Sequence, residues 1–376
     1  LAMLNADILP VIPCRGSVGA SGDLAPLAHL ALTLIGEGEA RQEDRLLEGP
    51  AVLQEIGRQP IELEAKEGLA LLNGTQASAA LAIAGLGQAE NLLATSILAG
   101  ASSVEGLAGS FAPFDSRIHE ARGMSGQCHV ATLFRALLDD SEVNHSHEDC
   151  DRVQDPYAIR CMPQVLGAVR DTLDHAASVL ARECNGVSDN PLIFGEDVLS
   201  GGNFHAEPLA FVSDFMAIAV AEIGAMSERR TDLLARRINP DLNMFLTEEP
   251  GLECGMMIAH VTAAALASEN KTLAHPASVD SMPTSAGQED HVSMAPWAGL
   301  KLLQVCENTA RILAIELLAA ARALDEQRPL RTTLRLEDLH ARLRMAVPAT
   351  PGDHRLDRDI RAVSSLISGG TLLDIL

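Results

Sequence analysis

The chain has 376 residues, enough to bury a substantial core, and its net charge of −23 argues against nucleic-acid binding. Hydrophobic residues make up 47% and charged residues 21%, which excludes an intrinsically disordered chain. Aromatic residues contribute only 3%, so the core has to be assembled from Ala, Leu, Ile, Val and Met. This composition favours closely packed helices.

Helical patterns dominate and begin at residues 25–35, where Asp23 is a suitable N-cap and Gly36 a suitable C-terminal stop. Residues 37–60 are polar and contain Gly and Pro, so they predict a loop with a short turn or strand. The helical patterns and the short polar loops between them predict an all-α fold, a long-helix bundle. Further helices are expected over residues 66–99 (one or two), 165–184, 207–235, 256–274 and 296–324, with shorter ones over 333–376.

We expect a single helical domain over residues 1–376, with a core bundle over about 1–330 and shorter helices over about 331–376. The chain opens on what resembles the end of a helix, so an upstream segment is expected. Seven scattered cysteines without a CxxC pair predict free, mostly buried thiols in a reducing cytoplasm. No uninterrupted apolar run of about 18 residues is present, so no membrane span is predicted.

His145, His147 and Cys150 are close in sequence and raise the question of a metal site. Their spacing is poor, and no second Cys/His pair completes the four ligands of a structural zinc site. We therefore expect no metal.

The Gly-rich loop at residues 16–23 reads Gly-Ser-Val-Gly-Ala-Ser-Gly-Asp and allows four interpretations. A phosphate-binding loop needs Lys followed by Ser or Thr after its last glycine, but Asp23 stands there and would repel phosphate. A nucleophile elbow needs G-x-S-x-G, which the residues around Ser21 do not match. A tight turn that caps the next helix is the purely structural interpretation.

The fourth interpretation is autocatalytic cyclisation of Ala20-Ser21-Gly22. The amide nitrogen of Gly22 can attack the carbonyl carbon of Ala20, because glycine has no Cβ to prevent the approach. Loss of two waters would then give a methylidene-imidazolone ring. Such a ring carries an electron-poor methylidene carbon and does work that ordinary side chains cannot do.

Residues 16–40 resemble the signature of the aromatic amino acid ammonia-lyase family. The resemblance implies an all-α fold of the ammonia-lyase/fumarase-like type and a homotetramer with active sites shared between subunits. It also implies a 4-methylidene-imidazol-5-one formed from Ala20-Ser21-Gly22, without metal or nucleotide. The resemblance continues through residues 71–76, 153–168, 185–194, 200–210, 245–252 and 267–296, and is weakest after residue 330.

The same resemblance assigns roles to single residues. Asn73 would hydrogen-bond near the ring or the substrate amine, although an Asn before Gly is also a common turn former. Arg160 suits a bidentate clamp for the substrate carboxylate, where the alternative is a solvated surface charge. Tyr157 lies three residues earlier, on the same side of a helical turn. Its phenol would stabilise developing charge or assist proton transfer, the alternative being a buried Tyr, and Gln154 would contact the ring.

Phe204 and Glu289 complete the implied site. Phe204 follows two glycines and would pack close to the cofactor, unless it is an ordinary core Phe. Glu289 bears on the substrate, because family members that act on phenylalanine or tyrosine typically lack this acid. Gln288-Glu289-Asp290-His291 resembles the histidine-specific members, in which a carboxylate can pair with an imidazole N–H. Gly287 departs from the Asn that is usual there and puts the local loop shape in question.

The resemblance therefore implies a cytoplasmic carbon–nitrogen lyase that eliminates ammonia from L-histidine non-oxidatively. The product would be trans-urocanate, and the reaction the first step of histidine catabolism. A phenylalanine or tyrosine ammonia-lyase, an aminomutase, and a truncated inactive helical core are the alternatives. The family also uses a loop tyrosine as base and a histidine near the substrate ring, both upstream of the Gly-rich loop, and no residue here matches their motifs. Nucleic acid and membrane are not expected partners.

Overall fold

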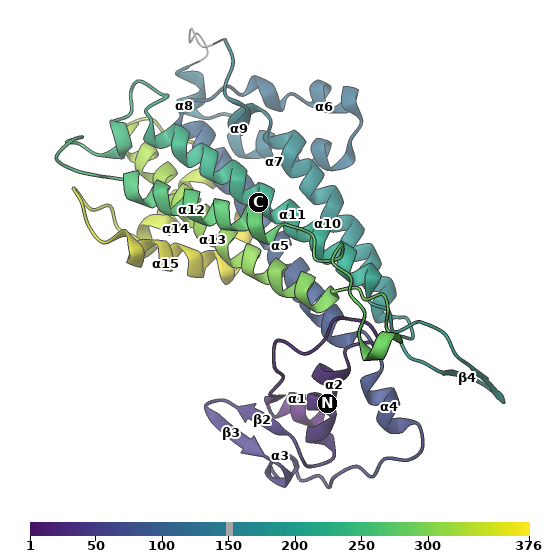
Figure 1. Cartoon of the computed structure of the whole chain (residues 1–376). Coiled ribbons are helices and arrows are strands. Elements are labelled where there is room, and N and C mark those ends of the chain that lie inside the picture. The colour runs from purple at the N-terminus through teal and green to yellow at the C-terminus, as the bar shows by residue number, and fades with distance from the viewer. Residues whose placement is uncertain (148–152) are drawn as a thin grey trace. The chain divides into compact units, whose positions relative to one another are not determined.

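The computed structural model describes residues 1–147 and 153–376 (Figure 1). Cys150, which was considered with His145 and His147 as a metal ligand, lies outside the described residues. The chain groups into two compact units, and the single domain over residues 1–376 stays a prediction. Unit 1 comprises residues 1–84, 177–214 and 276–302, and unit 2 comprises residues 85–176, 215–275 and 303–376.

Helices account for most of the described chain, which confirms the all-α fold class. The long helices lie where the apolar patterns predict them, and the expected region 66–99 forms two helices. The α-helices are α1 Ala2–Asn5, α2 Leu24–Leu34, α3 Pro50–Gln54, α4 Glu67–Leu72, α5 Gln76–Gly106, α6 Ser116–Arg122, α7 Ser125–Leu138, α8 Glu142–His145, α9 Tyr157–Arg160, α10 Met162–Cys184, α11 Glu207–Ala235, α12 Met257–Leu273, α13 Ala295–Glu326, α14 Leu334–Ala346 and α15 Leu356–Ser368.

Short strands occur only in unit 1 among the described residues. β1 (Ile8–Pro10), β2 (Glu39–Gln42) and β3 (Arg45–Glu48) form an antiparallel sheet in that order. A second antiparallel pair joins β4 (Leu192–Phe194) to β5 (Asp197–Leu199). The polar stretch 37–60 thus contains the expected strand, whereas β1 and the β4–β5 pair have no counterpart in the sequence prediction.

The small sheet of unit 1 has its own core, where Ile8, Ala40, Leu47 and Val52 pack together and are almost completely buried. Ala40 of β2 pairs with Leu47 of β3, so both side chains point to the same face of the sheet. This core supports the loops that follow β1 and precede α2.

α2 starts and stops close to its predicted ends, with Asp23 at the predicted N-cap position but without a side-chain capping bond. Gly36 adopts a left-handed φ of 81° just after the helix, as a C-terminal glycine should. Asp23 occupies the N-cap position, yet its side chain makes no capping hydrogen bond to α2. Its carboxylate instead accepts hydrogen bonds from the backbone nitrogen and the hydroxyl of Ser78, at 2.6 and 2.9 Å, in the first turn of α5.

The long helices of unit 2 are drawn in Figure 1, and small residues let them approach one another closely. A Cβ added to Gly224 of α11 would lie 3.2 Å from both Thr309 and Ile312 of α13. A Cβ added to Gly106, the last residue of α5, would lie 3.0 Å from the Cβ of Ala323. Close helix packing through Gly and Ala explains how a chain poor in aromatic residues fills its core.

Two apolar stretches, residues 67–106 and α11, are long enough by composition to span a membrane. In α11, however, 67% of the apolar window is buried inside the structure, as in the core helix of a globular protein. The cysteines of the described residues carry free thiols, as predicted, but most are not buried. Cys14, Cys184 and Cys254 are exposed, Cys128 and Cys161 are half-buried, and Cys306 is buried.

Candidate active site

The loop Ala20-Ser21-Gly22 is held tightly against the turn that precedes α5. The backbone nitrogen of Asp23 donates to the carbonyl oxygen of Gly74 at 2.7 Å. Gly22 has a φ of 79°, and a Cβ there would lie 2.5 Å from both the nitrogen and the oxygen of Gly74. Only glycine fits at this position, because any side chain would collide with backbone that cannot rotate away.

Two further segments clamp the same loop. The hydroxyl of Ser293 donates to the carbonyl oxygen of Gly19 at 2.9 Å, and the backbone nitrogen of Met294 donates to Val18 at 2.8 Å. The backbone nitrogen of Ala206 reaches the same Gly19 oxygen at 3.4 Å. These bonds bring the segments that carry Glu289 and Phe204 to the Gly-rich loop.

Ser21 and Glu289 are in direct contact. The hydroxyl of Ser21 donates to Oε1 of Glu289 at 2.5 Å, although 268 positions separate them in sequence. Oε2 of Glu289 accepts from Thr284 at 2.6 Å and from Ser285 at 2.8 Å. The hydrogen bond from Ser21, followed by those from Thr284 and Ser285, holds the pKa of Glu289 below its ordinary value. The site therefore contains an ionised carboxylate beside the serine that was predicted to be modified.

The loop around Glu289 has an unusual backbone that accounts for Gly287. Ser285, Ala286 and Gly287 have positive φ values of 49°, 55° and 87° in succession. Gly and Asn are the residues that tolerate this conformation best. Glycine therefore meets the same backbone requirement as the Asn that it replaces.

Asn73 is buried at the C-terminal end of α4, directly before Gly74. Its amide nitrogen donates to the carbonyl oxygen of Asn190 at 2.8 Å and lies 3.4 Å from the carboxylate of Asp189. Asp189 also pairs with Lys66 at 2.6 Å. Asn73 thus ties the Gly74 turn, and through it the Ser21 loop, to the segment before β4.

Phe204 is half-buried and therefore does not behave as an ordinary core Phe. It lies two residues before Ala206, whose backbone contacts Gly19. Its predicted position near the cofactor loop is compatible with this connection, and its role stays a prediction.

The remaining predicted residues belong to unit 2, where Gln154 and Arg160 line one pocket of about 700 Å³. The guanidinium carbon of Arg160 lies 4.6 Å from the centre of the Tyr157 ring, so the predicted proximity of these two side chains is confirmed. Tyr157 is 69% exposed, which rules out the buried tyrosine of the alternative interpretation. Nε of Arg160 is buried and has no hydrogen-bond partner among the described residues.

The predicted residues thus form two groups. The functional roles of all of them stay predictions. The sequence reasoning did not foresee the supporting contacts of Asp23, Asp189 and Ser293, although all three lie inside motifs that it had singled out. Unit 1 holds Ala20, Ser21, Gly22, Asn73, Phe204 and Glu289, and unit 2 holds Gln154, Tyr157 and Arg160.

Comparison with known proteins supports the assignment made from the motifs. The family model described as aromatic amino acid lyase matches residues 1–345. A histidine ammonia-lyase from Burkholderia ambifaria is 55% identical over 370 residues, which cover 98% of this chain and 73% of that protein. The crystal structure of histidine ammonia-lyase from Trypanosoma cruzi has a TM-score of 0.92 at 41% identity and covers all of this chain and 72% of that one.

Tyrosine aminomutase from Streptomyces globisporus has the same fold, with a TM-score of 0.93 at 37% identity over 99% of this chain and 74% of that one. The fold is thus shared by proteins with different named activities, whereas the sequence match extends over nearly the whole chain. The chain belongs to the aromatic amino acid lyase family.

Proposed function

We propose that this protein eliminates ammonia from L-histidine to give trans-urocanate. The observation that carries the proposal is the contact between the Ser21 hydroxyl and the Glu289 carboxylate at 2.5 Å. It brings together the residue expected to supply the electrophile and the one expected to recognise an imidazole. Sequence identity is higher to the histidine ammonia-lyase than to the tyrosine aminomutase, whereas the TM-scores hardly differ.

The residues present fit a 4-methylidene-imidazol-5-one made from Ala20-Ser21-Gly22. Cyclisation requires the Gly22 nitrogen to approach the Ala20 carbonyl, and the contact with Gly74 holds this turn in a compact form that only glycine can adopt. Ala20 and Gly22 are buried, which limits the access of water to the reacting backbone. Once formed, such a ring supplies an electron-poor carbon that no unmodified side chain offers.

Glu289 would recognise the substrate side chain. In the unmodified chain the hydroxyls of Ser21, Thr284 and Ser285 hold the ionised carboxylate in position. Cyclisation removes the Ser21 hydroxyl, and those of Thr284 and Ser285 would continue to hold it. An ionised carboxylate accepts a strong hydrogen bond from an imidazole N–H but has nothing to accept from a phenyl ring. Against an apolar ring the carboxylate would lose contact with water and gain no hydrogen bond from the substrate, which disfavours phenylalanine.

Arg160 would bind the substrate carboxylate. Its guanidinium group rests over Tyr157, its Nε is buried without a hydrogen-bond partner among the described residues, and the residue lines the same pocket as Gln154. Asp155 supports this segment by accepting a hydrogen bond from the Ser110 backbone at 2.7 Å. We expect Asn73 and Phe204 to act beside the cofactor loop. In a homotetramer in the cytoplasm, residues of the two groups would combine from different subunits.

Two measurements test the proposal. Intact mass should be lower than the encoded mass by about two waters, and the Ser21→Ala variant should lack this difference. Ultraviolet detection of urocanate should show turnover of histidine but not of phenylalanine or tyrosine. An unmodified mass contradicts the cofactor, whereas turnover of phenylalanine or tyrosine alone contradicts the substrate.

Substitution of Glu289 tests the specificity determinant. Glu289→Gln removes the charge but keeps the shape, so we expect histidine turnover to fall by about 100-fold, a magnitude typical for loss of one oriented polar contact in an active site. The mass difference and the melting temperature should change little. A loss of melting temperature that parallels the loss of activity would instead make Glu289 a structural residue.

A further inference from the structure

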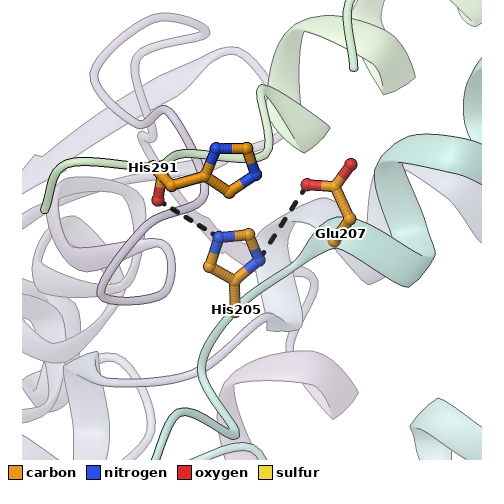
Figure 2. A group of neighbouring side chains, drawn as sticks. All are labelled: His205, Glu207 and His291. Atoms are coloured by element: carbon orange, nitrogen blue, oxygen red, sulfur yellow. Dashed lines mark hydrogen bonds and ion pairs between the residues drawn. The ribbon is translucent and has the colours of Figure 1, made fainter. Parts of the chain in front are cut away.

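His205, Glu207 and His291 form a cluster that the proposed reaction does not use (Figure 2). Each offers one nitrogen or oxygen, and the three atoms lie within 4.8 Å of one another. All three residues belong to unit 1: Glu207 is the first residue of α11, and His205 and His291 lie in loops. The two imidazole rings stack nearly parallel, with centroids 5.7 Å apart and an interplanar angle of 7°.

The hydrogen bond of His205 determines which of its nitrogens carries a proton. Nε2 of His205 lies 3.2 Å from the backbone carbonyl oxygen of His291. A carbonyl oxygen can only accept, so Nε2 must be the donor, and Nδ1 of the neutral ring carries a lone pair. An imidazole that donates one N–H to a carbonyl and presents the other nitrogen is the usual arrangement of a metal-ligating histidine.

Nδ1 of His205 faces a second electron-pair donor. Oε2 of Glu207 is the atom that it faces (Figure 2), at a distance of 4.0 Å, which is too long for a hydrogen bond. The same Oε2 is buried and has no hydrogen-bond partner among the described residues. A cation between this carboxylate oxygen and the imidazole nitrogen would stabilise both.

We propose that His205, Glu207 and His291 bind a divalent transition metal of the zinc class. Imidazole nitrogens and a carboxylate oxygen are ligands that zinc accepts, and three protein ligands leave a position for water. Ligand atoms around tetrahedral zinc lie about 3.3 Å apart, given bond lengths of about 2.0–2.1 Å. Reaching that spacing requires atoms up to 4.8 Å apart to approach by up to about 1.5 Å. The exposed side chain of His291 can rotate toward the other two ligands, and the 4.0 Å gap between His205 and Glu207 has to close by about 0.7 Å.

Such a site would join the start of α11 to the loop that carries Glu289, which lies two residues before His291. The inference is independent of the proposed substrate, because the three ligands are not among the residues assigned to it. Metal binding would stabilise the folded chain, since the ligand geometry is absent from the unfolded one.

The test is a titration of the chelator-treated full chain with Zn²⁺, followed by calorimetry and by the melting temperature. We expect one equivalent to bind and the melting temperature to rise. His205→Gln, Glu207→Gln and His291→Gln should each raise Kd by at least about tenfold, since even second-shell substitutions cost 10–100-fold. His354→Gln is the matched control, because it disrupts a half-buried histidine–carboxylate contact of 2.7 Å, with Asp359, in unit 2.

A cysteine variant distinguishes the loss of a metal ligand from the loss of binding through misfolding. His291→Cys should keep the metal and give Co²⁺ a thiolate charge-transfer band that the parent protein lacks. Retention of the parent Kd by all three Gln variants would overturn the inference, as would equal loss in His354→Gln. Absence of the thiolate band in a folded His291→Cys that binds Co²⁺ would exclude this residue as a ligand.

Discussion

The loops around Ser21 and the long helices of unit 2 solve the burial of charged groups in different ways. In the loops, the buried carboxylate of Asp23 accepts hydrogen bonds from a backbone nitrogen and from the hydroxyls of Ser17 and Ser78. In the helices, the buried carboxylate of Glu105 has one hydroxyl partner, Ser141, and its other oxygen has no partner among the described residues.

The difference follows from how each region uses its backbone. Interior residues of a helix use their N–H groups for the helix itself, so a buried charge must find its partners among side chains. Loops and helix N-termini still have N–H groups to offer. Glycine-rich loops can therefore build a polar site, whereas a helical bundle tolerates only a few buried charges and pairs them closely.

Gly22→Ala is expected to have the largest effect, and it acts on the loop region. The new Cβ would lie 2.5 Å from the backbone of Gly74, and the left-handed φ adds strain. We expect activity to fall by at least about 10³-fold, equivalent to ~4 kcal/mol of lost transition-state stabilisation, together with loss of the mass difference of about two waters.

Gly57→Ala is the matched control for this prediction. Gly57 also has a positive φ, 63°, but a Cβ there meets nothing within 4 Å. It should keep its activity and lose only about 1–2 kcal/mol of stability from the left-handed conformation. If Gly22→Ala keeps more than a tenth of the activity, or if Gly57→Ala is equally inactive, the tight turn is not what the site requires.

The same contrast explains how much could be predicted from the sequence. The helices α10, α11 and α13 lie where the apolar patterns place them, because periodicity reports directly on burial along a continuous helix. Loop contacts depend on residues far apart in sequence, so the Ser21–Glu289 hydrogen bond could not be inferred from spacing. The resemblance to a family selected both residues, but the distance between them comes from the structure.

Asp23 shows why a local rule can fail in such a region. Its position before α2 predicts an N-cap, and the backbone does take that position. The carboxylate bonds to the first turn of α5 instead, because the turn at Gly74 brings those donors within reach. The cluster of His205, Glu207 and His291 escaped prediction for the same reason, since its members come from two distant segments.

The second prediction concerns the buried ion pair of unit 2. Arg230 and Glu316 are fully buried and joined by two hydrogen bonds of 2.5 and 2.8 Å, and Ser103 donates to the same carboxylate. Glu316→Ala leaves an uncompensated buried guanidinium and should destabilise the protein by about 3–5 kcal/mol in urea unfolding. The double variant Arg230→Met/Glu316→Leu should recover most of this loss.

An exposed pair on the same helix provides the control. Glu307 and Arg311 of α13 form an i,i+4 pair whose side chains are 62% and 45% exposed. Glu307→Ala should change stability by no more than about 0.5 kcal/mol. Equal effects of Glu316→Ala and Glu307→Ala would show that the helices do not depend on the buried pair.

The smallest predicted effect is a pH dependence at Glu105. Burial raises the pKa of this carboxyl to about 7, an effect that the hydrogen bond from Ser141 opposes and the nearby charge of Glu337 adds to. In the unfolded chain the group ionises above about pH 4.5, so between these values the folded state binds more protons and stability falls as pH rises. The cost is absent below pH 4.5 and complete above pH 7, where it reaches about 3 kcal/mol.

Glu105→Gln resembles the protonated carboxyl at every pH and still accepts a hydrogen bond from Ser141. The variant should match the parent protein in urea unfolding at pH 4.5 and exceed its stability by up to about 3 kcal/mol at pH 8. A stability difference that is the same at both pH values would mean that folding does not raise the pKa of Glu105. The helices would then stabilise a singly partnered carboxylate as well as the loops stabilise Asp23, and the contrast between the two regions would not hold for carboxylates.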